Sequence, residues 1–264
     1  MSGLLPGRNT WELLGNFTVR NLKLKYQSSF LGFLWSLITP LMQMMIYTIV
    51  FSLIIRVKVD WPFTVFLLTA QLPWLFFSNS LMMGASSIIE HGNLIKKVSF
   101  KRILLPIATV CSNLINFILT LLVLTLFLAA YKIPFTVHIL YLIPAIVILA
   151  LFSLGLTFIT SALAVFFRDI FHILEVILLV WFWSVPVVYP ISYLNDVPPK
   201  WSWLVMVYRL NPMVHILELF RFTFLYQRSP SIRSVGYAAL SAVVSVVIGY
   251  LVFRKAAPRF AREI

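Results

Sequence analysis

The chain has 264 residues, of which 61% are hydrophobic and 11% charged, and its formal net charge is +13. Soluble domains carry about 25% charged residues, so this composition excludes an ordinary soluble protein and predicts an all-α polytopic membrane protein. Because long apolar runs separate the basic residues, we attribute the positive charge to membrane topology and lipid headgroups, and we expect no nucleic-acid partner. A single domain accounts for residues 1–264.

The first element is an amphipathic helix over residues 9–26. Arg20 and Lys23 share one face of this helix, while Leu13 and Phe17 fall on the opposite arc. Such a helix is typical of the inner membrane interface, where basic side chains meet lipid phosphates.

Six apolar runs predict six membrane-spanning helices, because a span needs at least about 17 residues. In the second of them, Ser80 and Gly84 form a pair of small residues four apart, which lets another helix approach closely. The predicted spans cover residues 31–55, 63–89, 103–130, 139–167, 173–189 and 235–253.

The distribution of Lys and Arg predicts the orientation. Of the 21 Lys and Arg residues, 13 fall on one side of the predicted spans, and by the positive-inside rule that side is the cytoplasm. Both termini are then cytoplasmic. These residues are Arg8, Arg20, Lys23, Lys25, Lys96, Lys97, Lys101, Arg102, Arg168, Arg254, Lys255, Arg259 and Arg262.

The loop over residues 90–102 is densely charged and lies between two apolar runs. Leu94, Ile95 and Val98 fall at helix spacing, which predicts a short amphipathic helix across the inner membrane face. One interpretation is that this helix docks a partner, and the other is that the loop only fixes topology. Its charged residues are Glu90, Lys96, Lys97, Lys101 and Arg102.

A different pattern covers residues 190–233, where two apolar pieces, 201–208 and 213–226, are too short to cross a membrane. We expect them to form re-entrant or interfacial helices outside. The alternative is an ordinary exterior loop with an aromatic belt.

Two local signals support a helix within this region. Asn211 and Pro212 suit an N-cap followed by a first-turn proline, and Glu218 can pair with Arg221 at i, i+3.

Aromatic residues cluster around the outer half of the fifth predicted span and the loop beyond it. Trp and Tyr gather at membrane interfaces in any case, but their faces also stack against sugar rings. The cluster consists of Trp181, Trp183, Tyr189, Tyr193, Trp201, Trp203 and Tyr208.

No cofactor or metal site is apparent in the sequence. The chain lacks a G-x-x-x-x-G-K-[ST] motif, so an ATPase that drives transport must be another chain. The predicted spans hold almost no ionisable residue, which disfavours a proton-driven carrier. The histidines, His91, His138, His172 and His215, are scattered, which gives little support to an enzyme.

Three stretches, residues 20–41, 73–106 and 209–221, resemble the transmembrane permease subunit of ABC-2 type exporters. The resemblance is to the group that exports lipid-linked polysaccharides such as O-antigen, capsule or teichoic acid. It implies a homodimer in the bacterial cytoplasmic (inner) membrane, docked on two copies of a cytoplasmic ATPase that binds ATP and Mg. The cargo implied is a polyprenyl-diphosphate-linked polysaccharide.

The resemblance also implies roles for particular residues. The coupling helix of the family maps onto Glu90, Asn93, Lys96, Lys97, Lys101 and Arg102, although relatives commonly have a proline where this chain has Lys101. Two further hypotheses rest on the residues themselves: Arg20, Lys23 and Lys25 meet either the lipid diphosphate or only membrane lipid phosphates, and Trp181, Trp183, Tyr189, Trp201 and Trp203 lie along the glycan path. The exterior re-entrant helices would carry Arg209, Asn211, Pro212, Glu218 and Arg221.

Two other functions stay open at this stage. One is an ABC-2 exporter of another amphipath, such as a drug or a smaller glycolipid. The other is a membrane-embedded glycolipid-modifying enzyme, which would turn over substrate without any ATPase.

Overall fold

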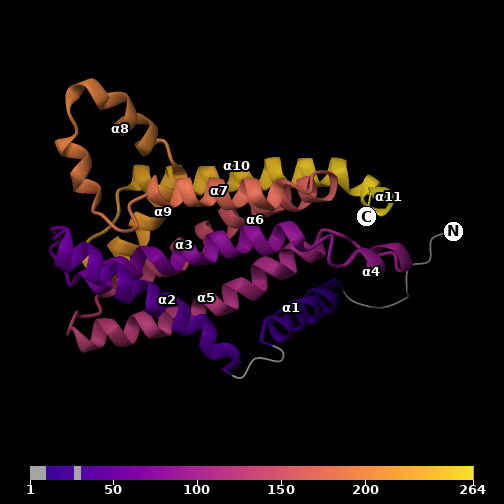
Figure 1. The fold of residues 1–264 in the computed structure, drawn as a ribbon, viewed down its shortest axis with the longest axis horizontal. Helices are drawn as coiled ribbons and strands as arrows, with labels where there is room; N and C mark the ends of the chain where they lie inside the picture. The colour runs from indigo at the N-terminus through magenta and orange to yellow at the C-terminus, as the bar shows by residue number, and fades with distance from the viewer. Residues whose placement is uncertain (1–9, 27–30, 264) are drawn as a thin grey trace.

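The computed structural model describes residues 10–26 and 31–263, and Arg8 of the predicted cytoplasmic set lies outside these residues. Within the described part of the chain the elements are helices only, which confirms the predicted all-α fold class. The long helices lie side by side along one axis, with α4 (Gly92–Lys97) and α11 (Phe260–Glu263) at one end and α8 (Ser202–Arg209) at the other (Figure 1).

The remaining elements follow the predicted order. They are α1 (Thr10–Tyr26), η1 (Gly32–Leu34), α2 (Trp35–Tyr47) with η2 (Thr48–Ile54), α3 (Phe63–Ser86), α5 (Leu104–Ala130), η3 (Val137–Tyr141), α6 (Leu142–Phe166), α7 (Ile170–Trp183), η4 (Ile191–Asp196), η5 (Pro199–Trp201), α9 (Pro212–Arg221) with η6 (Phe222–Tyr226), α10 (Ile232–Ala256) and η7 (Ala257–Arg259).

Five helical segments of the described chain are long and apolar enough to cross a membrane: α2 with η2, α3, α5, η3 with α6, and α10 with its C-terminal extension. The helix at the place of the fifth predicted span, α7, has only 14 residues. Six spans therefore remain a prediction.

The chain beyond α7 turns into the protein. Val185 and Val187 are fully buried, although they belong to the predicted span 173–189. Pro186 has no backbone N–H and disfavours a helical conformation of the residue before it, which explains why α7 ends at Trp183.

The helix α3 lies at the centre of the bundle, in contact with α5, α6, α7 and α9. Aromatic pairs join it to its neighbours, with ring centroids 5.3 Å apart for Phe76 and Phe117 and 5.8 Å apart for Phe77 and Phe152. This helix carries several buried polar residues, Thr69, Gln71 and Ser80, which are tolerated because protein rather than lipid surrounds it. For example, the buried Thr69 donates a hydrogen bond to the carbonyl of Phe66, at 2.7 Å.

Small residues allow the closest helix contacts. A Cβ atom added to Gly155 of α6 would overlap the backbone of Ser245 in α10, and one added to Gly249 would overlap the backbone of Gly155. The predicted approach at Ser80 and Gly84 is confirmed, since Thr157 of α6 packs on Gly84 and donates to the carbonyl of Ser80, at 3.2 Å. Such contacts drive helix association where lipid surrounds the bundle.

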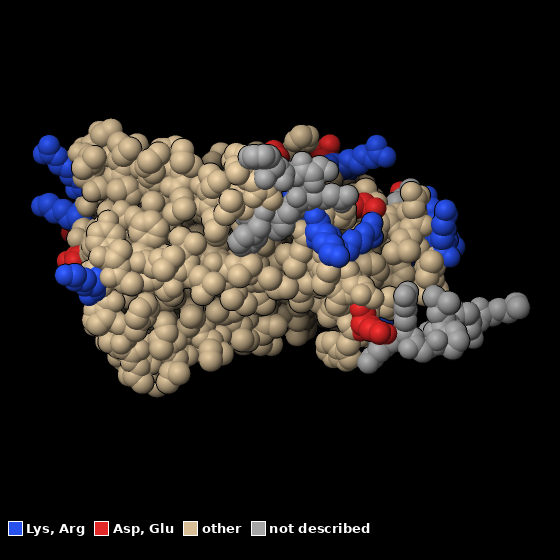
Figure 2. Space-filling view, turned by 90° about the horizontal axis from the view of Figure 1, so that it is seen from below, with Lys and Arg blue, Asp and Glu red and all other residues tan. Residues whose placement is uncertain are grey.

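Charged side chains lie at the two ends of the molecule. On the face seen in Figure 2, Lys and Arg gather at both ends and leave an uncharged belt between them. This arrangement is what a membrane of limited hydrocarbon thickness requires.

We expect Gly249→Val to destabilise the protein, because its side chain would force α6 and α10 apart. Overpacking of this kind costs about 1–3 kcal/mol, and the melting temperature in detergent measures the loss. Gly236→Val is the matched control, because Gly236 lies on the same helix and has no atom near its Cβ position. Equal melting temperatures for the two variants would contradict close packing at Gly249.

Candidate functional site

The predicted amphipathic helix of the charged loop is present as α4. Ile95 is buried, while Asn93, Lys96 and Lys97 are exposed. Glu90 and Lys101 on either side of α4 are exposed as well. One face of this segment is therefore held by the protein, and the other presents a cationic surface.

The buried face of α4 belongs to an apolar cluster at this end of the bundle, formed with α5, α6, α10 and α11. Phe260 of α11 is fully buried there, with its ring centroid 5.3 Å from that of Phe253. Arg102 differs from the exposed lysines, because its Nη1 donates to the backbone carbonyl of Ala257. The loop and the end of α10 together line a hollow of about 980 Å³. The cluster consists of Ile88, Ile95, Leu105, Phe158, Ala162, Val165, Phe253 and Phe260.

His91, the residue before α4, has a buried side chain. Its Nδ1 lies 2.8 Å from the carbonyl of Ser87, so this nitrogen carries the hydrogen. The imidazole and the Phe17 ring of α1 pack at nearly right angles, with their centroids 5.8 Å apart. Burial lowers the pKa of His91, outweighing the hydrogen bond to Ser87. The neutral imidazole is thus the form that fits between α1 and the charged loop.

The N-terminal helix α1 packs against α5, and Asn21 donates to the Thr109 hydroxyl at 3.4 Å. Arg20, Lys23 and Lys25 are all exposed. Their charged groups are therefore accessible, and contact with lipid phosphates stays a prediction.

The predicted N-cap at Asn211 is confirmed. The Asn211 side chain accepts a hydrogen bond from the backbone N–H of Met213 at 3.1 Å, and Pro212 is the first residue of α9. The same oxygen accepts from Trp181 Nε1 at 3.1 Å, which ties α7 to the start of α9. Arg209, just before, is exposed, and its carbonyl lies 2.8 Å from His215 Nε2.

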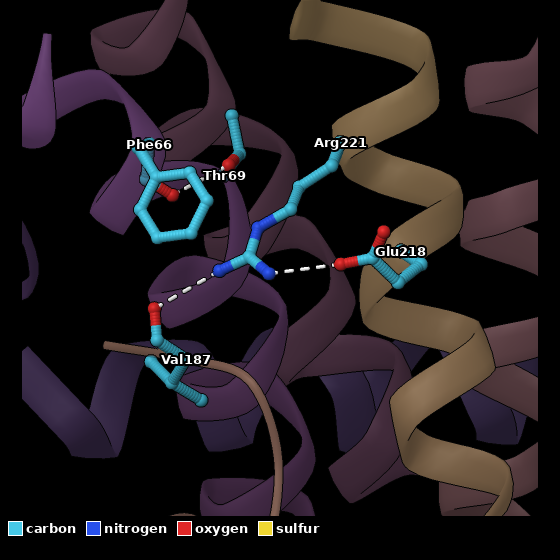
Figure 3. Close-up of polar contacts among 5 residues, drawn as sticks. All are labelled: Phe66, Thr69, Val187, Glu218 and Arg221. Carbon is cyan, nitrogen blue, oxygen red and sulfur yellow. Dashed lines mark hydrogen bonds and ion pairs between the residues drawn. The ribbon is translucent and has the colours of Figure 1, made fainter. Parts of the chain in front are cut away.

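The predicted pair of Glu218 and Arg221 is also present, and it is buried. Arg221 is fully buried and donates to the Glu218 carboxylate at 2.8 Å and to the carbonyl of Val187 at 3.1 Å. The ring of Phe66 lies over the guanidinium, 3.8 Å from it (Figure 3). One cation therefore joins α9, α3 and the segment that follows α7.

The predicted glycan-path aromatics lie in different surroundings. Trp181 packs inside the subunit, with its ring centroid 5.1 Å from that of Phe77, whereas Trp183, Trp201 and Trp203 are exposed. Tyr189 is half-buried and donates to the carbonyl of Trp183 at 3.0 Å. Three of the five rings thus face outward in the single chain.

A cavity with polar side chains in a mainly apolar wall was not predicted from the sequence. It lies between α2, α3 and α5, and Asn113 of α5 is a buried member of its wall. The amide residues within predicted spans were the signal that could have revealed it, since polar groups in hydrocarbon need partners.

Comparison with known proteins identifies the family. The family described as "ABC-2 type transporter" matches residues 12–225. The chain belongs to this family. It is 36% identical over 255 residues to "O-antigen export system permease protein RfbA" of Myxococcus xanthus, an alignment that covers 96% of this chain and 95% of the relative.

Other relatives agree with this ABC-2 assignment. A Klebsiella pneumoniae protein with the same description is 31% identical, covering 95% of this chain and 94% of its own. "Polysialic acid transport protein KpsM" of Escherichia coli is 25% identical, covering 89% and 90%. As an ABC-2 permease, the chain is a multi-pass membrane transport component and not an enzyme.

We expect Arg221→Leu to be strongly destabilising, because it leaves the Glu218 carboxylate buried without its partner. Breaking a buried ion pair in this way costs about 3–5 kcal/mol. The double variant Glu218→Leu/Arg221→Leu buries no charge, so its melting temperature in detergent should exceed that of Arg221→Leu. Additive losses in the two single variants and the double variant would contradict coupling between these residues.

We expect His91 to make the protein sensitive to acid. Since burial lowers its pKa in the folded state, unfolded chains bind the proton first as the pH falls below about 6.5, and stability is lost in that window. The measurement is the drop in melting temperature between about pH 7.5 and about pH 5.5. This drop should be smaller in His91→Gln, and an equal drop would show that His91 is not responsible.

Proposed function

We propose that this ABC-2 permease exports a polyprenyl-diphosphate-linked polysaccharide, similar to O-antigen, across the bacterial cytoplasmic membrane. It works as a homodimer of six-span subunits with both termini in the cytoplasm, and two copies of a cytoplasmic ATPase subunit bind ATP and Mg and drive it. The observation that carries the proposal is the 36% identity over 96% of the chain with an O-antigen export permease.

Charge and exposure support the orientation. The exposed basic residues of α1 and of the segment around α4 lie toward the end of the bundle where α11 is found, and they suit a cytoplasmic face. The cationic surface formed by Lys96, Lys97 and Lys101 suits docking of a separate ATPase chain. Among the described residues, no three His, Cys, Asp or Glu side chains lie close enough together to hold a metal ion.

Most of the apolar surface of α2 and of α7 is left uncovered in the single chain, which supports a path between two subunits. In α2 only Pro40 is buried, and in α7 only Leu174 and Leu178 are. The two helices meet near their outer ends, where the rings of Tyr47 and Phe182 stack at 6.1 Å. A second copy of the chain would cover these apolar faces, and movement of α2 and α7 would open a passage between the copies.

Force would reach this passage through the segment around α4. Closure of the ATPase on ATP moves α4, and the buried contacts of Ile95 and His91 pass the movement to α1, α5 and α10. At the outer side, the Arg221 contacts link α9 to the chain that leaves α7. Movement of α7 therefore reaches the exterior helices.

Deletion of the gene tests the cargo directly. We expect polyprenyl-linked polysaccharide to accumulate inside the deletion strain and to disappear when the gene is restored. Normal export in the deletion strain would exclude this cargo and leave another amphipath as the transported molecule.

The triple variant Lys96→Glu/Lys97→Glu/Lys101→Glu tests the docking surface. Because reversed charges repel a complementary acidic face, we expect several-fold less ATPase to copurify with the variant and export to fall with it. Lys132→Glu, which changes an exposed lysine of the predicted exterior turn, is the control and should export normally. Full copurification with the triple variant would place the ATPase elsewhere.

A further inference from the structure

The cavity between α2, α3 and α5 has a volume of about 420 Å³, within the usual range for small-ligand sites. It begins near Lys25, at the end of α1, and reaches Thr120 in the middle of α5. Polar side chains from all three helices line it, although each of these helices is apolar enough to cross a membrane. A purely apolar occupant would leave these polar side chains without partners.

Asn113 gives the strongest indication that the cavity holds a polar group. Its side chain is 3% exposed, and neither its amide nitrogen nor its amide oxygen has a hydrogen-bond partner. An unpaired amide costs several kcal/mol in hydrocarbon. The nearby Gln43 and Gln71 avoid part of this cost, because Gln71 Nε2 donates to Gln43 Oε1 at 2.9 Å.

The lining defines the chemistry of the occupant. Asn79, Asn113 and Gln43 carry amides, which donate and accept hydrogen bonds as hydroxyl groups do, and Phe117 offers an aromatic face. The charged member of the lining is Lys25, at the mouth. This combination suits a hydroxyl-rich group with an anion at one end.

We propose that the cavity binds the headgroup of an inner-leaflet amphipath. Its phosphate lies at Lys25, and the hydroxyl-rich group attached to that phosphate reaches Asn113. Two sources share this chemistry. One is the lipid-proximal sugar of a polyprenyl-diphosphate-linked glycan, a source that rests on the proposed function, and the other is phosphatidylglycerol of the membrane itself.

Cysteine labelling in nanodiscs tests the proposal. In a Cys111→Ala background, which removes the single cysteine of the chain, Asn113→Cys places a thiol in the cavity. Leu122→Cys is the matched control, because Leu122 lies on the same helix and is 58% exposed on the apolar surface. A small charged methanethiosulfonate reagent reaches only thiols in contact with water.

The nanodiscs contain phosphatidylethanolamine alone, or with added phosphatidylglycerol, or with polyprenyl-diphosphate-linked oligosaccharide extracted from the host. In the first lipid we expect Asn113→Cys to react several-fold faster than Leu122→Cys. One of the two additions should then slow its reaction several-fold and thereby identify the source. If neither lipid slows the labelling, the cavity holds only water. If Asn113→Cys is not labelled at all, the cavity is dry. Either result overturns the proposal.

Asn113→Leu separates binding from folding. Leucine removes the unpaired amide, so we expect an unchanged or higher melting temperature together with a several-fold loss of export. Cys111→Leu, two residues away, is the control. Normal export by Asn113→Leu would overturn a role of the cavity in export. Protection by phosphatidylglycerol in the labelling experiment does not depend on the exported cargo, so failure of the proposed function and failure of the site remain distinguishable.

Discussion

Backbone contact between α6 and α10 is the interaction on which the bundle depends. In a membrane the surrounding lipid is as apolar as the helix surfaces, so burial from water contributes little to helix association and close packing must replace it. Gly155 and Gly249 provide this packing between α6 and α10, and Gly84 provides it between α3 and α6. With α6 held between α10 and α3, protein encloses α3, and this enclosure lets α3 carry the buried Thr69, Gln71 and Ser80.

Local sequence signals predicted much of the molecule. Helix spacing identified the buried and exposed sides of α4, and the Asn-Pro pair identified the start of α9, because both patterns depend on neighbours within one or two turns. The spacing of Glu218 and Arg221 predicted their contact for the same reason. Apolar length located the long spans, since bilayer thickness sets that length.

What the sequence did not reveal depends on distant partners. The burial of Arg221 requires Phe66 and Val187, which come from other parts of the chain. The inward turn after α7 follows from the fit of Val185 and Val187 into the core, although Pro186 gives a local signal that α7 ends there. Trp181 looked like its exposed neighbour Trp183, and only the packing of α7 on α3 and α6 separates them. The Asn113 cavity likewise requires three helices to come together.

The Phe260 ring packs in the same buried cluster as Ile95, so it holds the end of the chain against the segment around α4. Truncated forms of the protein would lose this contact. A chain that ended before Phe260 would keep every helix able to cross a membrane, so it would still insert. It would lack the Phe260 ring, which packs against Phe166 and Phe253 beneath the cationic surface. If two copies form one transporter, such a chain would join intact subunits and silence them, and the defect would be dominant.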